Sequence, residues 1–275
     1  MTSALTRDHA RAIGERLDRS PLCVMLDVDG TLAPIVATPD QARVPDDTRE
    51  VVARLARAAS TTVVLVSGRA AADAWRVASV ADSSVWVIGN HGLEIREPSG
   101  RIVQDDAVRG FDAAIGRAAD VLQAEFQDIQ GAIVENKRWT LSVHYRIVDE
   151  RHTPRIRERT AAIARELGLR VLDGKKIVEL RPPIDVNKGT ACVAFAKQLG
   201  VSDSRGSVLY AGDDRTDEDA FRELRAVLPG AVTVRIAAGD EVPASTHAEL
   251  VIATLPEFRE LLEWIAERRE SATSQ

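Results

Sequence analysis

Short apolar segments alternate with longer amphipathic ones along the first third of the chain. Leu22 to Leu26 is an apolar run that is too short for a helix and ends in Asp and Gly, so it predicts a buried strand. Two similar runs, 62–66 and 85–88, follow segments at 46–59 and 70–79 that predict helices. This strand–helix order is typical of a parallel sheet with right-handed crossovers.

The pattern changes beyond residue 93. Two short runs, 94–96 and 101–103, flank a Pro-Ser-Gly segment and predict a hairpin. One predicted helix followed by two predicted strands then occurs twice in succession. The helices are expected at 107–127 and 154–167, and the strands at 132–135, 140–145, 170–172 and 176–180. This order predicts an α+β module with an antiparallel sheet.

Apolar strands resume after the pair Pro182-Pro183. They are expected at 207–211, 232–236 and 250–252, with helices at 190–199, 218–227 and 256–270. The sequence therefore predicts an α/β fold with a Rossmann-like parallel core at 1–105 and 184–275. An α+β cap domain of order α-β-β-α-β-β is expected as an insertion at 106–183. A length of 275 residues suits a core with a smaller second domain.

Composition and charge restrict the class of partner. The net charge is −6, from 42 acidic and 36 basic residues, and no basic stripe with interleaved aromatic residues occurs, so nucleic acid is not expected to bind. The first 20 residues lack the apolar core of a signal peptide, and no stretch is apolar enough to span a membrane. Two cysteines make no disulfide framework. We expect a cytoplasmic, monomeric protein.

Polar residues follow the predicted core strands at the points where they end. The set comprises Asp27 and Asp29 after the first strand, Ser67, Gly68 and Arg69 after the second, Asn90 and His91 after the third, Asp213, Asp214 and Asp217 after the first strand beyond the cap, and Lys188 at the start of the preceding helix. A lone Asp-Gly usually marks a turn, and a lone Asp-Asp often caps a helix. Parallel sheets bind ligands at the carboxyl ends of their strands, so the conjunction indicates one site.

The residue types in this set indicate phosphoryl transfer. Gathered carboxylates repel one another unless a cation lies among them, and oxygen-rich clusters suit Mg²⁺. The predicted helix start at Asn187-Lys188-Gly189 offers backbone N–H groups to an anion. Asp27 can attack phosphorus, whereas Asp29 can protonate the leaving oxygen and then deprotonate water.

Four motifs, in order, resemble the haloacid dehalogenase superfamily. They are Asp-x-Asp-Gly-Thr at 27–31, Ser-Gly-Arg at 67–69, Lys-Gly at 188–189 and Gly-Asp-Asp at 212–214, and the second aspartate resembles the phosphatase branch. A narrower resemblance is to the trehalose 6-phosphate phosphatase family. It is carried by segments 26–35, 89–94, 142–146 and 212–221 and by the cap pieces 135–137 and 179–182. Together these cover the chain from roughly residue 20 to 260.

The resemblance implies Mg²⁺-dependent hydrolysis of trehalose 6-phosphate through an aspartyl-phosphate on Asp27, with Asp29 as general acid and base. Asp27, the backbone carbonyl of Asp29 and Asp213 would bind Mg²⁺. Asp214 and Asp217 would support the waters of the metal and Lys188, while Ser67, Gly68 and Lys188 would hold the phosphate. The family often has an aromatic residue where this chain has Val28, which we expect to affect packing only.

Residues that bind the sugar are expected in both domains, because sugar hydroxyls need paired donors and acceptors. The candidates are Arg69, Asn90 and His91 in the core and Glu135, Lys137, His144, Arg146 and Glu179 in the cap. Charged residues are also usual on the solvated face of an antiparallel sheet. Two alternatives therefore stay open: a phosphatase of a sucrose, mannosylglycerate or glucosylglycerate phosphate, and a non-catalytic sugar-phosphate sensor.

Overall fold

The computed structural model describes residues 7–82, 84–174, 176–237 and 245–273. The chain divides into two compact units, the first made of Met1–Val103 with Val186–Gln275 and the second of Gln104–Asp185. The boundaries expected from the sequence, at 105/106 and 183/184, lie within a few residues of these. The predicted α/β class is confirmed, since the first unit has a parallel sheet and the second an antiparallel one.

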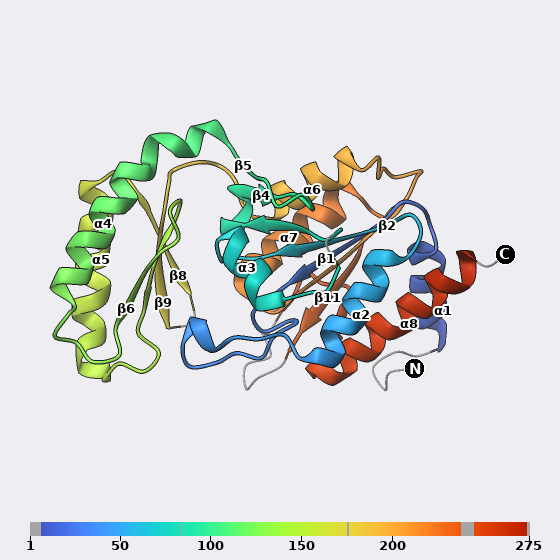
Figure 1. The fold of residues 1–275 in the computed structure, drawn as a ribbon, viewed down its shortest axis with the longest axis horizontal. Coiled ribbons are helices and arrows are strands. Elements are labelled where there is room, and N and C mark those ends of the chain that lie inside the picture. The colour runs from blue at the N-terminus through green and yellow to red at the C-terminus, as the bar shows by residue number, and fades with distance from the viewer. Residues whose placement is uncertain (1–6, 83, 175, 238–244, 274–275) are drawn as a thin grey trace. The chain divides into compact units, whose positions relative to one another are not determined.

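An eight-stranded sheet of order β12-β11-β10-β1-β2-β3-β4-β5 forms the centre of the first unit (Figure 1). Its strands are β1 (Leu22–Asp27), β2 (Thr61–Val66), β3 (Trp86–Gly89), β4 (Glu94–Arg96), β5 (Ile102–Gln104), β10 (Ser207–Gly212), β11 (Val232–Ile236) and β12 (Leu250–Ile252). The pairs from β12 to β3 are parallel, and β4 is antiparallel to β3. The central strand β1 therefore lies between β2 and β10, which are distant in sequence.

Helices cover both faces of this sheet (Figure 1). They are α1 (Arg7–Leu17), α2 (Asp46–Arg57), α3 (Ala71–Ala78) and α8 (Leu255–Thr273) on one face, and α6 (Lys188–Gln198) and α7 (Arg215–Val227) on the other. Val24 and Leu26 of β1 pack in the first of these two cores, and Cys23 and Met25 pack in the second. Because β1 is buried on both faces, every position of it is apolar up to Asp27.

The second unit is a four-stranded antiparallel sheet of order β6-β7-β9-β8 with two helices. Its elements are α4 (Asp112–Glu125), β6 (Ile133–Asn136), β7 (Leu141–His144), α5 (Thr153–Glu166), β8 (Arg170–Gly174) and β9 (Ile177–Arg181). The helices pack on the face that carries Val143, Val178 and Leu180. The single helix expected at 107–127 is in fact a 3₁₀ helix, Asp106–Phe111, followed by α4.

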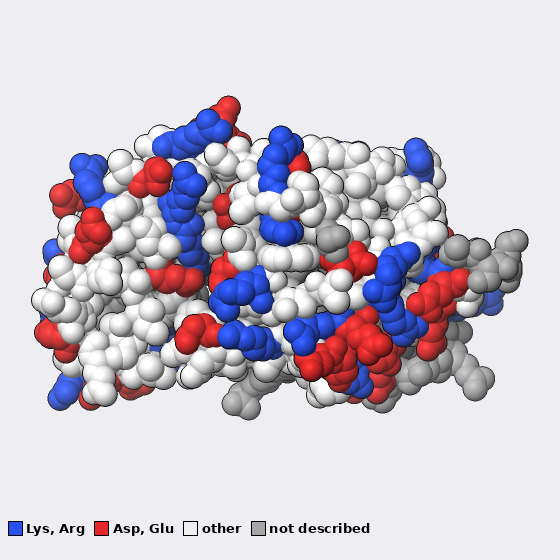
Figure 2. All heavy atoms as spheres, in the orientation of Figure 1, with Lys and Arg blue, Asp and Glu red and all other residues white. Residues whose placement is uncertain are grey.

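Acidic and basic side chains lie interspersed on the face of the molecule shown in Figure 2. Ion pairs join α2 to α8 within the first unit, between Arg54 and Glu270 at 2.9 Å and between Asp47 and Arg259. Among the helices in the described part of the chain, none is both long and apolar enough to cross a membrane.

Candidate active site

The carboxyl end of β1 carries two aspartates in a tight turn. Asp27 is the last residue of the strand and is 4 % exposed, and Asp29 follows it in the turn. The turn is closed by a hydrogen bond from the Gly30 N–H to the Ala33 carbonyl at 2.7 Å. Gly30 has φ of +91°, and a Cβ atom there would overlap the Asp213 carboxylate. Glycine therefore lets the turn approach the loop that follows β10.

Lys188 lies buried between two carboxylates. Its side chain is 2 % exposed, and its Nζ donates to Asp27 Oδ1 at 2.7 Å and to Asp217 Oδ1 at 2.8 Å. It is the first residue of α6, whose start is closed by a reciprocal cap. The Asn187 side chain accepts from the Thr190 N–H at 2.9 Å, and the Thr190 hydroxyl accepts from the Asn187 N–H at 3.0 Å. This cap fixes the backbone from which Lys188 reaches β1.

Asp217 organises the loop that follows β10. Its Oδ2 accepts from the backbone N–H groups of Asp213 at 2.9 Å and Asp214 at 3.0 Å, and its Oδ1 also accepts from the Tyr210 hydroxyl at 2.6 Å. The Asp214 side chain caps α7 by accepting from the Thr216 N–H at 2.8 Å. The Asp213 carboxylate is thereby held against Gly30 without being used to build the loop.

The ionisation of the cluster reflects burial and crowding of like charge. Burial, together with neighbouring carboxylates, raises the pKa of Asp27 and Asp213 well above the usual range, although Lys188 opposes the shift. Burial and the charge of Asp214 raise the pKa of Asp217 to about 6, again against Lys188. Burial alone would lower the pKa of Lys188, but Asp217 and Asp27 raise it well above the usual range. When ionised, these carboxylates carry more negative charge than Lys188 can balance, which is why their protonated forms are favoured here.

The acidic residues fit a divalent cation. Asp27, Asp213 and Asp217 each place a carboxylate oxygen so that these atoms lie within 4.8 Å of one another. Asp213 Oδ1 is buried and has no hydrogen-bond partner among the described residues. Asp217 is engaged by Lys188, Tyr210 and two backbone N–H groups, so Asp27 and Asp213 are the side chains with ligand atoms to offer. An all-oxygen donor set suits a hard cation.

The loop that follows β2 packs closely against the loop that follows β3. Ser67 is 1 % exposed, and its backbone carbonyl accepts from the His91 N–H at 3.0 Å. A Cβ atom at Gly68 would overlap the His91 imidazole, so this close approach requires glycine. Asn90 and His91 have φ of +47° and +57°, a left-handed conformation that costs energy in residues other than glycine. Such strain in two consecutive residues is typical of functional loops.

Asn90 lies within the fold of this loop. It is fully buried, and its Nδ2 donates to Glu94 Oε1 at 2.9 Å. The same oxygen accepts from the Ala71 N–H at the start of α3 at 2.6 Å. Asn90 and Glu94 therefore join the loop after β3 to α3, whereas the sequence suggested a substrate contact for Asn90.

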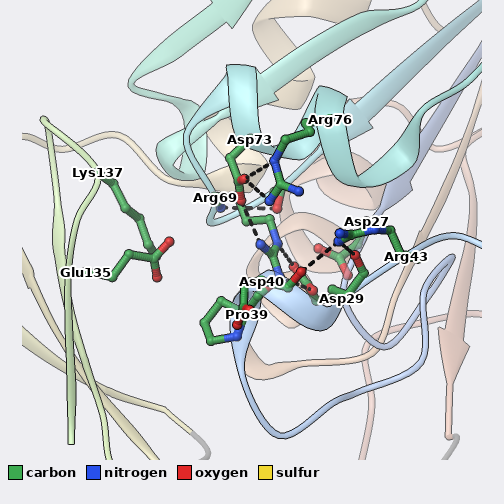
Figure 3. Close-up of polar contacts among 12 residues, drawn as sticks. Asp27, Asp29, Pro39, Asp40, Arg43, Arg69, Asp73, Arg76, Glu135 and Lys137 are labelled. Carbon is green, nitrogen blue, oxygen red and sulfur yellow. Dashed lines mark hydrogen bonds and ion pairs between the residues drawn. The ribbon is translucent and has the colours of Figure 1, made fainter.

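Arg69 binds the second aspartate of the turn after β1 (Figure 3). Its Nε donates to Asp29 Oδ2 at 2.6 Å and its Nη2 to Asp29 Oδ1 at 2.8 Å. Its Nη1 donates to Asp73 Oδ2 at 2.6 Å, and Nη2 also to the Pro39 carbonyl at 3.0 Å. Burial would lower the pKa of Arg69, but the hydrogen bonds and charges of Asp29 and Asp73 outweigh it and raise that pKa.

Sequence reasoning missed two residues that this geometry reveals, Asp73 and Tyr210. Asp73 lies four positions after Arg69, a spacing at which side chains meet near a helix start. Tyr210 lies in an otherwise apolar strand, where a buried phenol needs a hydrogen-bond partner. Both residues could have been singled out from the sequence, but the sequence did not indicate which residue each of them contacts.

Charged residues of the second unit gather on the sheet face opposite α4 and α5. The register pairs Glu135 with Ser142 and Ser142 with Glu179, so their side chains share that face. His144 Nε2 lies 2.7 Å from Glu135 Oε2, and Lys137 Nζ lies 3.4 Å from Glu179 Oε1. Arg181 Nε donates to Glu179 Oε2 at 2.6 Å, a partner that the sequence did not indicate.

Arg146 is a cap candidate that lies outside the strands of the sheet. It is exposed and lies in the turn after β7, which ends at His144. The alternation that would set its side chain beside His144 therefore stops before it.

The fold and the site define the class of protein first. A parallel sheet with paired aspartates after its central strand, a buried lysine and an acidic loop after β10 is the arrangement of the haloacid dehalogenase superfamily. The particular family follows from comparison with known proteins. The chain belongs to the trehalose-phosphatase family, whose model matches residues 25–252.

Individual relatives agree with this family. The chain is 36 % identical over 223 residues to a probable trehalose-phosphate phosphatase D of Arabidopsis thaliana, covering 78 % of this chain and 59 % of that protein. It is 36 % identical over 258 residues to a probable trehalose-phosphate phosphatase 3 of Oryza sativa, covering 88 % and 68 %. A solved trehalose-6-phosphate phosphatase related protein matches with a TM-score of 0.77 at 26 % identity, covering 92 % of this chain and 100 % of that one.

Proposed function

We propose that this chain is an Mg²⁺-dependent phosphoric monoester hydrolase that converts trehalose 6-phosphate to trehalose and phosphate. The observation that carries the proposal is the buried Asp27 carboxylate at the end of β1, held by Lys188 at 2.7 Å and close to the Asp213 carboxylate. Membership of the trehalose-phosphatase family and the names of the relatives support the substrate. Since the chain spans 59 % of the Arabidopsis relative, the activity is proposed from the matched part alone.

The proposed reaction has two steps at phosphorus. In the first, an oxygen of Asp27 attacks, the bond from phosphorus to the sugar oxygen breaks, and Asp29 gives that oxygen its proton. In the second, Asp29 takes a proton from a water that attacks the aspartyl-phosphate, which releases phosphate and restores the Asp27 carboxylate. Lys188, Ser67 and the Gly68 N–H would hold the phosphoryl oxygens during both steps.

The metal proposal concerns three groups of the first unit. Asp27, the backbone carbonyl of Asp29 and Asp213 would hold Mg²⁺, with Asp214 and Asp217 keeping the loop after β10 in place. When bound, Mg²⁺ supplies positive charge to the phosphoryl oxygens. This assignment is supported by Asp213 Oδ1, which has no hydrogen-bond partner in the described part of the chain.

We propose that the sugar is recognised by the polar face of the second unit. Glu135, Lys137, His144 and Glu179 offer both donors and acceptors there, and Arg146 and His91 are further candidates. Arg69 and Asn90 are bound to protein groups in the first unit, so we do not assign them to the sugar. We further propose a cytoplasmic monomer that acts on a small molecule, without a nucleic-acid or membrane partner.

The test is phosphate release from a panel of phosphorylated sugars, with Mg²⁺ and with chelator. Trehalose 6-phosphate should exceed sucrose, mannosylglycerate and glucosylglycerate phosphates by about 100-fold in kcat/KM, and chelator or Asp27→Asn should abolish release. Glu179→Gln should reduce this preference, whereas Glu166→Gln, an exposed position on α5, should not. A higher kcat/KM for another ester would make that ester the substrate in place of trehalose 6-phosphate. Binding of a sugar phosphate without release of phosphate would favour the non-catalytic sensor.

A further inference from the structure

We infer that Arg69 is a positioning residue that holds Asp29 in place for proton transfer, and that Asp73 holds Arg69 in turn. The inference rests on the proposed function, which gives Asp29 the proton transfers in both steps. It reassigns Arg69, for which the sequence suggested contact with the sugar. Arg69 is held by contacts with Asp29, with Asp73 and Pro39, and with the loops that fix its backbone.

The contact between Arg69 and Asp29 is bidentate. Nε and Nη2 of Arg69 meet Oδ2 and Oδ1 of Asp29 at 2.6 and 2.8 Å, so two parallel hydrogen bonds fix the plane of the carboxylate. The Asp29 side chain is 33 % exposed and lies in a turn beyond the end of β1. A carboxylate in such a position would otherwise sample several rotamers. The planar fork of the guanidinium removes that freedom, and an ammonium group cannot reproduce it.

The guanidinium itself is held from two other segments (Figure 3). Nη1 donates to Asp73 Oδ2 at 2.6 Å on α3, and Nη2 donates to the Pro39 carbonyl at 3.0 Å. Asp73 Oδ1 also accepts from Arg76 Nη2 at 2.6 Å, so Asp73 bridges two arginines. The side chain of Arg69 is 9 % exposed, which leaves little room for another rotamer.

The backbone of Arg69 is fixed by the same loops that build the phosphate end of the site. Its N–H donates to Ser67 Oγ at 3.1 Å, and its carbonyl accepts from the Asn90 N–H at 2.7 Å. The position of Asp29 is therefore tied to the loops after β2 and β3 as well as to β1. Proton transfer requires a donor that is already in place, so this rigidity contributes directly to the rate.

The paired geometry corresponds to one stage of the proposed cycle. A carboxylate whose two oxygens both accept from Arg69 is the form of Asp29 that the proposed second step needs, in which Asp29 takes a proton from water. Before the first step, one oxygen carries the proton and is released from Arg69, while the other keeps its hydrogen bond. As the bond from phosphorus to the sugar oxygen breaks, that proton moves to the sugar oxygen and the second hydrogen bond to Arg69 reforms.

The test compares leaving groups in Arg69→Lys. Trehalose needs a proton on its leaving oxygen, whereas the nitrophenolate of p-nitrophenyl phosphate leaves without one. We expect the first turnover of trehalose 6-phosphate in rapid-quench measurements to slow about 100-fold. The nitrophenolate burst should stay within about threefold, and its steady-state rate should fall, because attack by water also uses Asp29. The substrate dissociation constant, taken from the concentration dependence of the first turnover, should stay within about threefold for both substrates.

Two further variants and a rescue separate positioning from a structural role. Arg76→Gln shares the Asp73 acceptor but is half-exposed and serves as the matched control, with rates expected within twofold of wild type. Asp73→Asn should show the same leaving-group pattern at about tenfold. Guanidinium ion should partly restore Arg69→Ala on trehalose 6-phosphate, whereas an equal concentration of sodium chloride should not.

Other results would overturn the inference. Equal loss in both first turnovers would assign Arg69 to phosphate binding or to the fold, and a rise in the dissociation constant of trehalose 6-phosphate alone would return it to the sugar. Unchanged rates would remove any role. If wild type releases nitrophenolate but leaves trehalose 6-phosphate intact, the proposed substrate fails separately, and the same comparison is made with the sugar phosphate it does hydrolyse.

Discussion

The two ends of strands β1 and β2 each hold a buried cation, and the partners of the two cations differ in kind. At the carboxyl ends, Lys188 lies between the carboxylates of Asp27 and Asp217. At the amino ends, Arg269 of α8 is 4 % exposed and donates to backbone carbonyls and hydroxyls. Its Nη1 donates to the Asp18 carbonyl at 3.0 Å, and its Nη2 to the Ala59 carbonyl at 2.9 Å.

The difference shows that partner chemistry, rather than burial, separates a structural cation from one in a reacting site. The partners of Arg269 are neutral oxygens of the loops before β1 and β2, which accept hydrogen bonds from its guanidinium. Burial lowers the pKa of Arg269. Around Lys188, carboxylates raise the lysine pKa and leave Asp213 Oδ1 without a partner among the described residues. At the amino ends, oxygen atoms of the protein accept the hydrogen bonds of the buried cation. At the carboxyl ends, the carboxylates and Lys188 can still bind a further cation and an anion.

Lys188→Met should have the largest effect. It removes the positive charge beside Asp27 and a proposed phosphate contact, so kcat/KM for phosphate release should fall by on the order of 10³-fold. Lys197→Met, an exposed lysine on the same helix, should leave kcat/KM unchanged. Full activity in Lys188→Met would make this lysine as structural as Arg269.

Arg269→Met should mainly affect stability. It removes hydrogen bonds to several backbone carbonyls that are buried or partly buried, so the free energy of unfolding in urea should fall by about 3 kcal/mol, with kcat/KM of the folded enzyme preserved. The neighbour Arg268 pairs with Asp18 near the surface, and Arg268→Met should cost about 1 kcal/mol or less. Equal losses in the two variants would contradict the assignment of Arg269 as a buried structural hub.

Mg²⁺ should complete the carboxyl end and raise the Tm by about 5 °C. The pKa of Asp27 and Asp213 is raised, so protons compete with the metal, and the increase should be smaller at about pH 5 than at about pH 8. Differential scanning calorimetry would measure it. Asp213→Asn should abolish the increase, and Asp203→Asn, at an exposed position, should not. An increase that survives in Asp213→Asn would place the metal elsewhere.

Tyr210→Phe should have the smallest effect of the four. Its hydroxyl donates to Asp217 Oδ1 at 2.6 Å, and loss of a hydrogen bond to a charged group should lower kcat/KM about tenfold. The other tyrosine, Tyr145, accepts from Arg157 Nη1 at 3.2 Å in the second unit, so Tyr145→Phe is a matched control. No change in Tyr210→Phe would show that Lys188 and the loop N–H groups suffice to hold Asp217.

Much of this molecule follows from local sequence pattern. The run from Leu22 to Asp27 is apolar at every position because β1 is buried on both faces, so the strand was predictable. The boundary of α4 was not, because the apolar spacing of a 3₁₀ turn at Asp106–Phe111 is hard to tell from that of an α-helix. Strand alternation also fails to place Arg146, because β7 ends at His144, two residues before it.

The sequence by itself determined the residue types of the candidate site, because the aspartates and the lysine follow predicted strand ends and a helix start, where the backbone leaves the sheet. Only the tertiary structure decided which of these side chains meet. It set β10 beside β1, which brings Asp213 and Asp217 to Asp27, and it set Arg69 on Asp29 rather than toward a ligand. Such contacts join segments far apart in the chain, and their geometry depends on strand order and burial, which no local pattern encodes.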